Sequence, residues 1–151
     1  IAKKNNINIC YEAAVAGAIP IINVLENRML LENITNINGI LNGTCNYILS
    51  KMNERNLTFE TALKNAQNEG FAETDPYDDI SGNDTAYKLV ILTNLIFSSN
   101  FKINDVYIEG IAKVSNIDLE MANKLGYTIL LLGISNTPLL KIKTYMKNQL
   151  S

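Results

Sequence analysis

An acidic segment in the middle of the chain constrains its fold more than any other feature. Six carboxylates lie within sixteen residues, without a basic residue among them: Glu69, Glu73, Asp75, Asp78, Asp79 and Asp84. The segment opens at Gly70, a residue type that commonly ends a helix, and it has turn sequences at Asp75-Pro76 and Ser81-Gly82. An apolar helix is predicted to follow. The chain must therefore place a dense group of negative charges between two helices.

The first basic residue after this segment, Lys88, comes four residues after Asp84 in the predicted helix. Residues at i and i+4 share one face of a helix, so the ammonium group and the carboxylate are expected to meet. The pair alone has an ordinary interpretation, an exposed ion pair that stabilises a helix by about 0.2–0.5 kcal/mol. The surrounding carboxylates and turns favour a second interpretation, a pocket that holds an ammonium group and moves a proton.

The absence of histidine narrows the chemistry further, because it excludes His-based catalytic triads, His general bases and most zinc sites. Proton transfer would fall to a lysine, a tyrosine or a carboxylate. The two cysteines, Cys10 and Cys45, lack C-x-x-C spacing and suggest a reducing compartment, so we expect a cytoplasmic protein. Both are expected to be buried as small hydrophobic residues.

Length and composition indicate a single ordinary domain over residues 1–151. Hydrophobic residues make up 47% of the chain, charged residues 19%, and the formal net charge is -2. A chain of this length buries roughly 70% of its unfolded surface. The composition argues against disorder and against nucleic-acid binding. The apolar runs at 89–92 and 129–132 are far shorter than the ~20 residues of a membrane span, and no signal peptide is evident.

Hydrophobic periodicity predicts a mixture of helices and strands without a regular alternation. The predicted helices cover residues 20–29, 45–55, 59–69, 83–97 and 116–125. The predicted strands cover residues 6–12, 34–41, 106–111, 127–135 and 139–146. Thr44 and Thr58 are expected to cap the second and third helices. The pattern predicts an α+β fold, with one mixed, largely antiparallel sheet and helices packed on one face.

Two other motifs fail on inspection. A calcium-binding EF-hand loop starting at Asp75 would need an acidic or amide residue at its third position and glycine at its sixth, but the chain has Tyr77 and Ile80 there. The run Ala16-Gly17-Ala18 has only one glycine and lacks the G-x-G-x-x-G pattern of a dinucleotide loop. Close backbone packing explains it better. If the protein uses a dinucleotide, we expect the main dinucleotide-binding domain outside this chain.

Three blocks of the sequence resemble the catalytic and dimerisation region of homoserine dehydrogenases. They read YEAAVAGAIPII at 11–22, NGILNGTCNYILSKM at 38–52, and AQNEGFAETDPYDDISGNDTAYKLVIL at 66–92. A weaker fourth block lies at 109–133. The resemblance spans nearly the whole chain, and the third block is very specific.

The resemblance implies NAD(P)-dependent interconversion of L-homoserine and L-aspartate 4-semialdehyde, a step toward threonine and methionine. It implies that Lys88 donates the proton, that Glu73 and Asp84 hold the substrate, and that Asp79 belongs to the same polar site. It also places Gly70 at the cofactor, NADP or NAD, and implies a homodimer. A further implication is a bound sodium ion that takes oxygens from the block containing Glu12, Val15, Gly17 and Ile19.

The chemistry of the residues agrees with this resemblance. Reduction of an aldehyde develops negative charge on its oxygen, and an ammonium donor such as Lys88 stabilises that charge and protonates the oxygen. An amino-acid substrate carries its own ammonium group, for which Glu73 and Asp84 would supply carboxylates. Backbone carbonyls that converge at a turn of small residues suit a hard cation, since such ions prefer oxygen.

The chain also departs from the family. Family enzymes begin with a Rossmann domain, carry a second active-site lysine upstream of the segment that matches this chain, and have a later segment that returns to the cofactor domain. Because the chain begins at Ile1 rather than Met, we expect it to be a piece of a longer protein. We expect that piece to bind NADP poorly and to turn over little.

Two alternatives stay open from the sequence. The chain could be a self-association module that keeps only a dimer interface, or part of a related dehydrogenase that acts on another amino semialdehyde. The preference for NAD or NADP is also open, because the residue that reads the ribose would lie in the cofactor domain.

Overall fold

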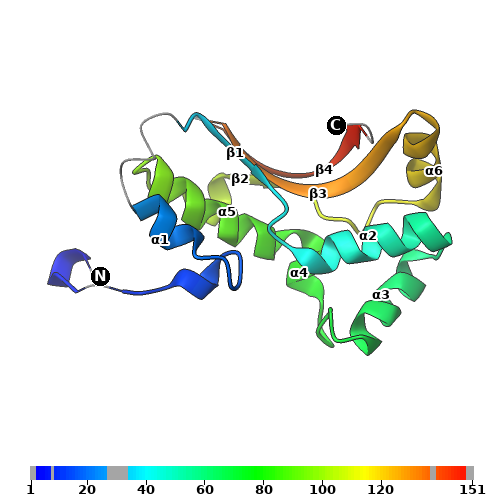
Figure 1. The fold of residues 1–151 in the computed structure, drawn as a ribbon, viewed down its shortest axis with the longest axis horizontal. Coiled ribbons are helices and arrows are strands. Elements are labelled where there is room, and N and C mark those ends of the chain that lie inside the picture. The colour runs from blue at the N-terminus through cyan, green and yellow to red at the C-terminus, as the bar shows by residue number, and fades with distance from the viewer. Residues whose placement is uncertain (1–2, 8, 27–33, 137–138, 149–151) are drawn as a thin grey trace.

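A four-stranded sheet with helices on one face makes up the body of the molecule (Figure 1). The computed structural model describes residues 3–7, 9–26, 34–136 and 139–148. The elements in chain order are η1 (Lys3–Asn5), η2 (Glu12–Ala14), α1 (Ile21–Glu26), β1 (Asn36–Gly39), α2 (Gly43–Arg55), α3 (Phe59–Asn68), α4 (Tyr77–Ser81), α5 (Asn83–Ile96), η4 (Ile103–Asp105), β2 (Val106–Ile108), α6 (Asn116–Lys124), β3 (Tyr127–Asn136) and β4 (Leu139–Asn148).

The sheet is mixed and largely antiparallel, in the order β1-β3-β4-β2. β3 pairs with both β1 and β4 in antiparallel fashion, whereas β2 joins the edge of β4 in parallel. The predicted α+β class, the single sheet and the placement of the helices on one face are therefore confirmed. The turn predicted at Asn136-Thr137-Pro138 lies mostly outside the described residues.

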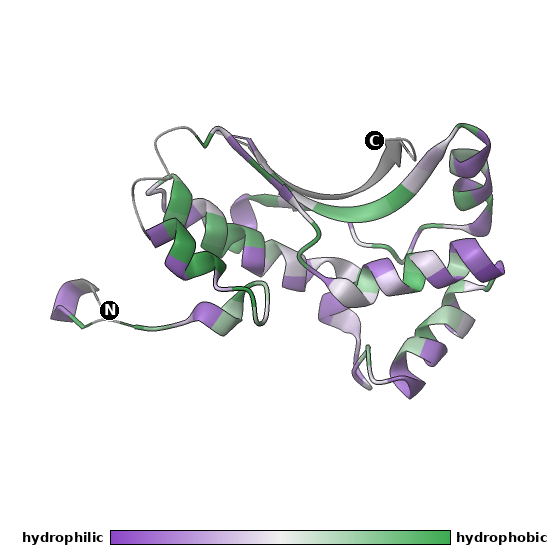
Figure 2. Ribbon diagram, in the orientation of Figure 1, coloured by the Kyte–Doolittle hydropathy of each residue, from purple (hydrophilic) through white to green (hydrophobic). Residues whose placement is uncertain are grey.

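The hydrophobic core lies between the sheet and the helices beneath it. Leu131 on β3 is 1% exposed, and it packs in one cluster with Ile48 and Leu49 of α2 and Leu89 of α5. Figure 2 shows apolar stretches, coloured green, in both β3 and α5. Because α5 runs under the sheet, burial of its middle fixes the place of its first two turns, where Asp84 and Lys88 lie.

The predicted strand at 6–12 is wrong. In the part of the chain that the structure describes, residues 6, 7 and 9–11 form no strand, and Ile7 and Ile9 are 61% and 63% exposed. The segment leads away from the body at the left of Figure 1. Alternating residues need a neighbouring strand to become half buried, and this segment has none among the described strands. Cys10 is exposed for the same reason, whereas Cys45 is buried as predicted.

Helix caps decide the geometry around the acidic segment. Thr58 caps α3 as predicted, and its hydroxyl oxygen accepts the Thr61 N–H. The cap of α2 is Asn42 rather than Thr44, because the helix begins at Gly43, two residues earlier than predicted. The Thr44 hydroxyl instead donates to the carbonyl of Phe71, at 2.7 Å.

The acidic segment folds as a short helix between two turns, an element that the sequence pattern did not predict. The Asp75 carboxylate accepts the Tyr77 N–H at 3.1 Å and so starts α4, and Gly82 ends it with φ of 89°. A positive φ of this kind favours glycine. The two predicted turns are therefore present, with one helical turn carrying Asp79 between them.

In the described residues, no helix is long and apolar enough to cross a membrane.

Candidate active site

A pocket of about 460 Å³ lies where the start of α2, the loop after α3, α4 and the start of α5 come together. Its lining residues are Asn42, Gly43, Thr44, Gly70, Phe71, Ala72, Glu73, Asp79, Asp84 and Lys88. The pocket thus contains the five residues predicted to bind the substrate or cofactor or to carry out the chemistry. The acidic segment forms one wall, and the corner between β1 and α2 forms the other.

The Lys88 ammonium group is held from two sides. Its Nζ donates to Asp84 Oδ2 at 2.7 Å and to the carbonyl of Leu41 at 3.1 Å. The side chains of Lys88 and Asp84 are 26% and 30% exposed, so the ion pair is partly screened from water. An ammonium group has three N–H donors, and the described residues accept two of them. One donor therefore stays available to a molecule in the pocket.

Asn42 links the two aspartates of the pocket, a role that the sequence analysis missed. Its Nδ2 donates to Asp79 Oδ1 at 2.6 Å and to Asp84 Oδ2 at 2.8 Å, while its Oδ1 accepts the Cys45 N–H at 2.9 Å. The residue is 5% exposed. The available signal was an Asn-Gly pair between a strand and a helix, where asparagine is a favoured cap.

The loop after α3 is fixed against α2, and this places Glu73 at the pocket. The Phe71 and Ala72 N–H groups both donate to the carbonyl of Ala66. The Phe71 ring stacks on Tyr47 of α2, with centroids 4.5 Å apart. Gln67 donates to the Glu73 carbonyl at 3.1 Å. The Glu73 carboxylate is exposed at the pocket wall, where it can meet a cationic group of a ligand.

Two glycines leave open backbone at the pocket. Gly70 has φ of 79°, and a Cβ on Gly70 or Gly43 would have no protein atom within 4 Å, since both positions face open space. A flat ring can approach bare backbone more closely than it can approach a side chain. A ligand in the pocket can therefore approach the backbone of these two residues closely, and the cofactor contact of Gly70 stays a prediction.

Cys45 lies behind the aspartates and is not a nucleophile. Its Sγ donates to the carbonyl of Asp79 at 3.0 Å. Burial, with the negative charges of Asp79 and Asp84 as further causes, raises the pKa of the Cys45 thiol to about 12. At neutral pH the thiol is therefore protonated and uncharged. Its contribution is to hold α4 against α2.

The predicted sodium ligands do not line this pocket. The Glu12 carboxylate accepts the N–H groups of Ile22 and Asn23, at 2.7 and 2.9 Å, and so it caps the start of α1. Val15 is fully buried, and Gly17 has a positive φ. Within the described ranges, no cluster of three or more His, Cys, Asp and Glu side chains is placed to bind a metal. The sodium ion stays a prediction from the resemblance.

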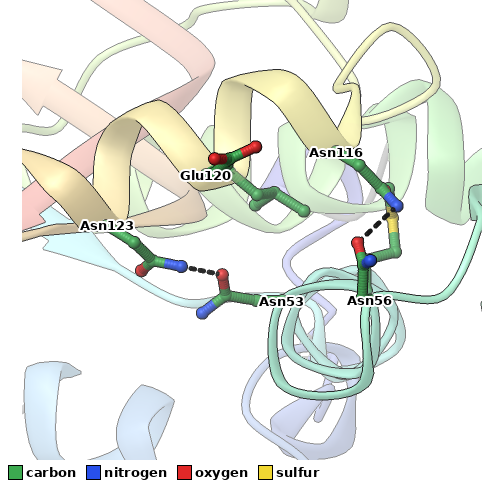
Figure 3. Close-up of a pocket in the computed structure, with 7 residues that line it drawn as sticks. Asn53, Asn56, Asn116, Glu120 and Asn123 are labelled. Atoms are coloured by element: carbon green, nitrogen blue, oxygen red, sulfur yellow. Dashed lines mark hydrogen bonds between the residues drawn. The ribbon is translucent and has the colours of Figure 1, made fainter.

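A second pocket, of about 240 Å³, lies between α2 and α6 and is shown in Figure 3. Its polar groups are mainly side-chain amides that bond to one another across the two helices. Asn116 donates to Asn56, and Asn123 donates to Asn53. The amides thus join the helices, and none of the predicted site residues lies there.

Comparison with known proteins agrees with the geometry. The family model of homoserine dehydrogenase matches residues 20–150. The chain is 52% identical over 132 residues to the homoserine dehydrogenase of Methanocaldococcus jannaschii. The matched region covers 87% of this chain and 39% of that protein. It is 45% identical over 134 residues to the Bacillus subtilis homoserine dehydrogenase, covering 89% of this chain and 31% of that protein. The chain thus spans between three and four tenths of the length of these relatives.

Solved structures show the same likeness. The homoserine dehydrogenase of Thiobacillus denitrificans superposes with a TM-score of 0.89 at 39% identity, covering 96% of this chain and 35% of that chain. A hyperthermophilic archaeal homoserine dehydrogenase, solved in complex with NADPH, superposes with a TM-score of 0.80 at 30% identity, covering 97% of this chain and 42% of that chain. The family model, the relatives and the folds all agree, so this chain belongs to the homoserine dehydrogenase family.

Proposed function

We propose that residues 1–151 are the catalytic, substrate-binding and dimerisation domain of an enzyme that interconverts L-homoserine and L-aspartate 4-semialdehyde with NAD(P). In the cell this step would lie toward threonine and methionine, in the cytoplasm. The observation that carries the proposal is that Lys88, Asp84 and Glu73 line one pocket beside the bare backbone of Gly70. Family membership and the NADPH bound to an archaeal relative support the choice of reaction and cofactor.

Lys88 is the proposed proton donor for reduction of the semialdehyde. When bound, the nicotinamide supplies a hydride to the carbonyl carbon, or takes one from homoserine in the reverse direction. The third N–H of Lys88 would hydrogen-bond the carbonyl oxygen, stabilise the negative charge that develops there, and then transfer its proton. The 2.7 Å hydrogen bond to Asp84 would hold the Lys88 side chain in place for this transfer.

Glu73 and Asp84 are proposed to hold the ammonium group of the substrate. Both line the pocket, and Asp84 Oδ2 is engaged by Lys88 and Asn42, which leaves its other oxygen to the substrate within the described contacts. Glu73 is exposed at the pocket, where a substrate can reach its carboxylate. This pair of carboxylates argues against a substrate that lacks an amine.

The exchange Glu73→Gln should raise KM for homoserine about tenfold, because a charge-assisted hydrogen bond contributes roughly 1.5–3 kcal/mol and Glu73 is exposed, which favours the lower limit. Steady-state kinetics of the full-length protein would measure this, with circular dichroism to check folding. The matched control is Glu60→Gln, which removes an exposed carboxylate of α3 that does not line the pocket. An unchanged KM would remove Glu73 from the substrate site.

The proposal as a whole is tested by assaying the full-length protein for homoserine-dependent reduction of NAD or NADP. Activity with homoserine, and little with hydroxy compounds that lack the amine, is the expected result. The isolated 151-residue chain should show little or no turnover, because family enzymes bind the cofactor mainly through a Rossmann domain. Full activity of the isolated chain would contradict this last point, and no homoserine turnover by the full-length protein would contradict the function.

The proposal includes a homodimer, and the uncovered face of the sheet supports it. Leu131 points to the helices, so Leu130, Leu132 and Ile134 lie on the opposite face, where they are only half buried. Tyr107 of β2, between residues that face the helices, is 56% exposed. Sedimentation of the full-length protein should give twice the mass of one chain, and a monomer at micromolar concentration would argue against the dimer.

A further inference from the structure

The corner between β1 and α2 contacts all but one of the charged side chains that line the active-site pocket. The carbonyl of Leu41 accepts from Lys88 Nζ at 3.1 Å. The adjacent Asn42 donates from one nitrogen to Asp79 at 2.6 Å and to Asp84 at 2.8 Å. These two aspartates come from different helices, α4 and α5, so a single amide bridges two elements.

The orientation of this amide is fixed by the contact of its oxygen. The Asn42 Oδ1 accepts the Cys45 N–H at 2.9 Å. Turning the amide over would place its oxygen against two carboxylates and its NH₂ group against the Cys45 N–H, so both contacts would become repulsive. The cap of α2 therefore forces the NH₂ group to point at the aspartates.

The contacts converge on one atom, Asp84 Oδ2, which accepts from both Asn42 and Lys88. Two carboxylates that approach each other repel, and a shared donor between them offsets that repulsion. Without the amide, Asp79 and Asp84 would move apart. Because Lys88 is bonded to Asp84, its ammonium group would move with Asp84 and no longer point into the pocket.

We propose that Asn42 is a positioning residue for proton transfer: its amide holds Asp79 and Asp84 in place and, through Asp84, aims the Lys88 ammonium group. The catalytic part of this inference rests on the proposed function. It assigns two roles to Asn42. The hydrogen bond by which this residue caps α2 also fixes the geometry of the charged groups.

Two exchanges at this position separate the two duties of Asn42. Serine is a good helix cap but is too short to bridge the aspartates, whereas alanine neither caps nor bridges. In the full-length protein, Asn42→Ser and Asn42→Ala should both lower kcat for homoserine oxidation about 10- to 100-fold, since small misplacements of catalytic groups cost rates of this order. Only Asn42→Ala should also lower Tm clearly. If kcat instead changes in parallel with Tm, so that Asn42→Ser has nearly normal activity and only Asn42→Ala loses activity, Asn42 acts only as a structural helix cap and the inference is wrong.

Asn46→Ser is the matched control, because Asn46 is also a buried asparagine of α2 but bonds to backbone atoms of Leu131 and Asn42 rather than to carboxylates. It should lower Tm and leave kcat within about threefold of the unmodified protein. A loss of kcat as large as that of Asn42→Ser would show that any damage to α2 disturbs the site, which would overturn the inference.

A second measurement does not depend on activity and so separates this inference from the proposed function. Asp79→Asn removes one of the two charges that Asn42 bridges. In the Asn42→Ser variant those charges repel without a shared donor, so removing one of them should be more favourable there. The change in Tm caused by Asp79→Asn should therefore be more positive in Asn42→Ser than in the unmodified protein. Equal Tm changes in both backgrounds would overturn the bridging role. If this coupling is found but the full-length protein does not turn over homoserine, the proposed function fails while the bridge stands.

Discussion

Replacement of Lys88 by methionine in the full-length protein should lower kcat for homoserine oxidation by about a thousandfold, within the range that general acid–base groups contribute. Methionine fills the same space but cannot donate a proton or stabilise charge on the substrate oxygen. The side chain of Lys88 is only 26% exposed, but methionine fills its space, so the exchange should leave the fold intact. Steady-state kinetics together with circular dichroism would measure both effects.

The chain supplies a closely matched control for this experiment. Lys124 forms the same type of i,i+4 ion pair, with Glu120 on α6, but both side chains are 65% exposed and lie away from the active-site pocket. Lys124→Met should change the free energy of unfolding by less than about 0.5 kcal/mol and leave kcat unchanged. If Lys88→Met behaves like Lys124→Met, Lys88 is an ordinary surface ion pair and the proposed mechanism is wrong.

Gly110→Ala should lower the free energy of unfolding by about 2–3 kcal/mol, the upper range for forcing extra volume into packed structure. A Cβ at this position would overlap the Ile80 carbonyl oxygen and lie 2.6 and 2.7 Å from the Ser81 carbonyl carbon and oxygen. These are backbone atoms, which cannot move aside as a flexible side chain can. The adjacent Ile111 N–H, which donates to Ile80 at 2.9 Å, would lose its partner.

This exchange should also reduce activity, because Ile80 and Ser81 belong to α4, the helix that carries Asp79. Denaturant unfolding and kinetics at a temperature where the variant is folded would measure the two effects separately. Gly39→Ala is the control, since a Cβ there would meet only the Leu41 side chain, at an ordinary 3.7 Å. Stability of Gly110→Ala equal to that of Gly39→Ala would show that the contact between the 110–111 loop and α4 is loose.

Features set by neighbours in the chain could be predicted well from the sequence. The Asp84–Lys88 pair follows from helical spacing alone, and the structure forms it at 2.7 Å. The strand predicted at 127–135 is present as β3, and the structure buries Leu131 of this strand in the core. The glycine at position 70 and the threonine cap at position 58 marked the limits of α3 correctly. Each of these depends on hydrogen bonds or side-chain directions within a few residues.

Features that depend on distant partners were missed or wrong. The alternating residues 6–12 predicted a strand, but strand formation needs a partner, which the described sheet does not offer. The bridge from Asn42 to Asp79 and Asp84 joins positions 37 and 42 residues apart, so no local spacing reveals it. The parallel addition of β2 beside β4 is likewise a pairing between distant segments.

The sequence by itself determined which chemical groups are present. It has no histidine, and it places a group of carboxylates before Lys88, of which Asp84 shares a helix face with that lysine. Only the tertiary structure decided that Asn42, Gly70, Glu73 and Asp79 join them around one pocket. The physical reason is the range of the forces involved. Helix periodicity and capping act over a few residues, whereas the pocket exists because burial of the core fixes α2, α4 and α5 against one another, and that packing brings separate parts of the chain together.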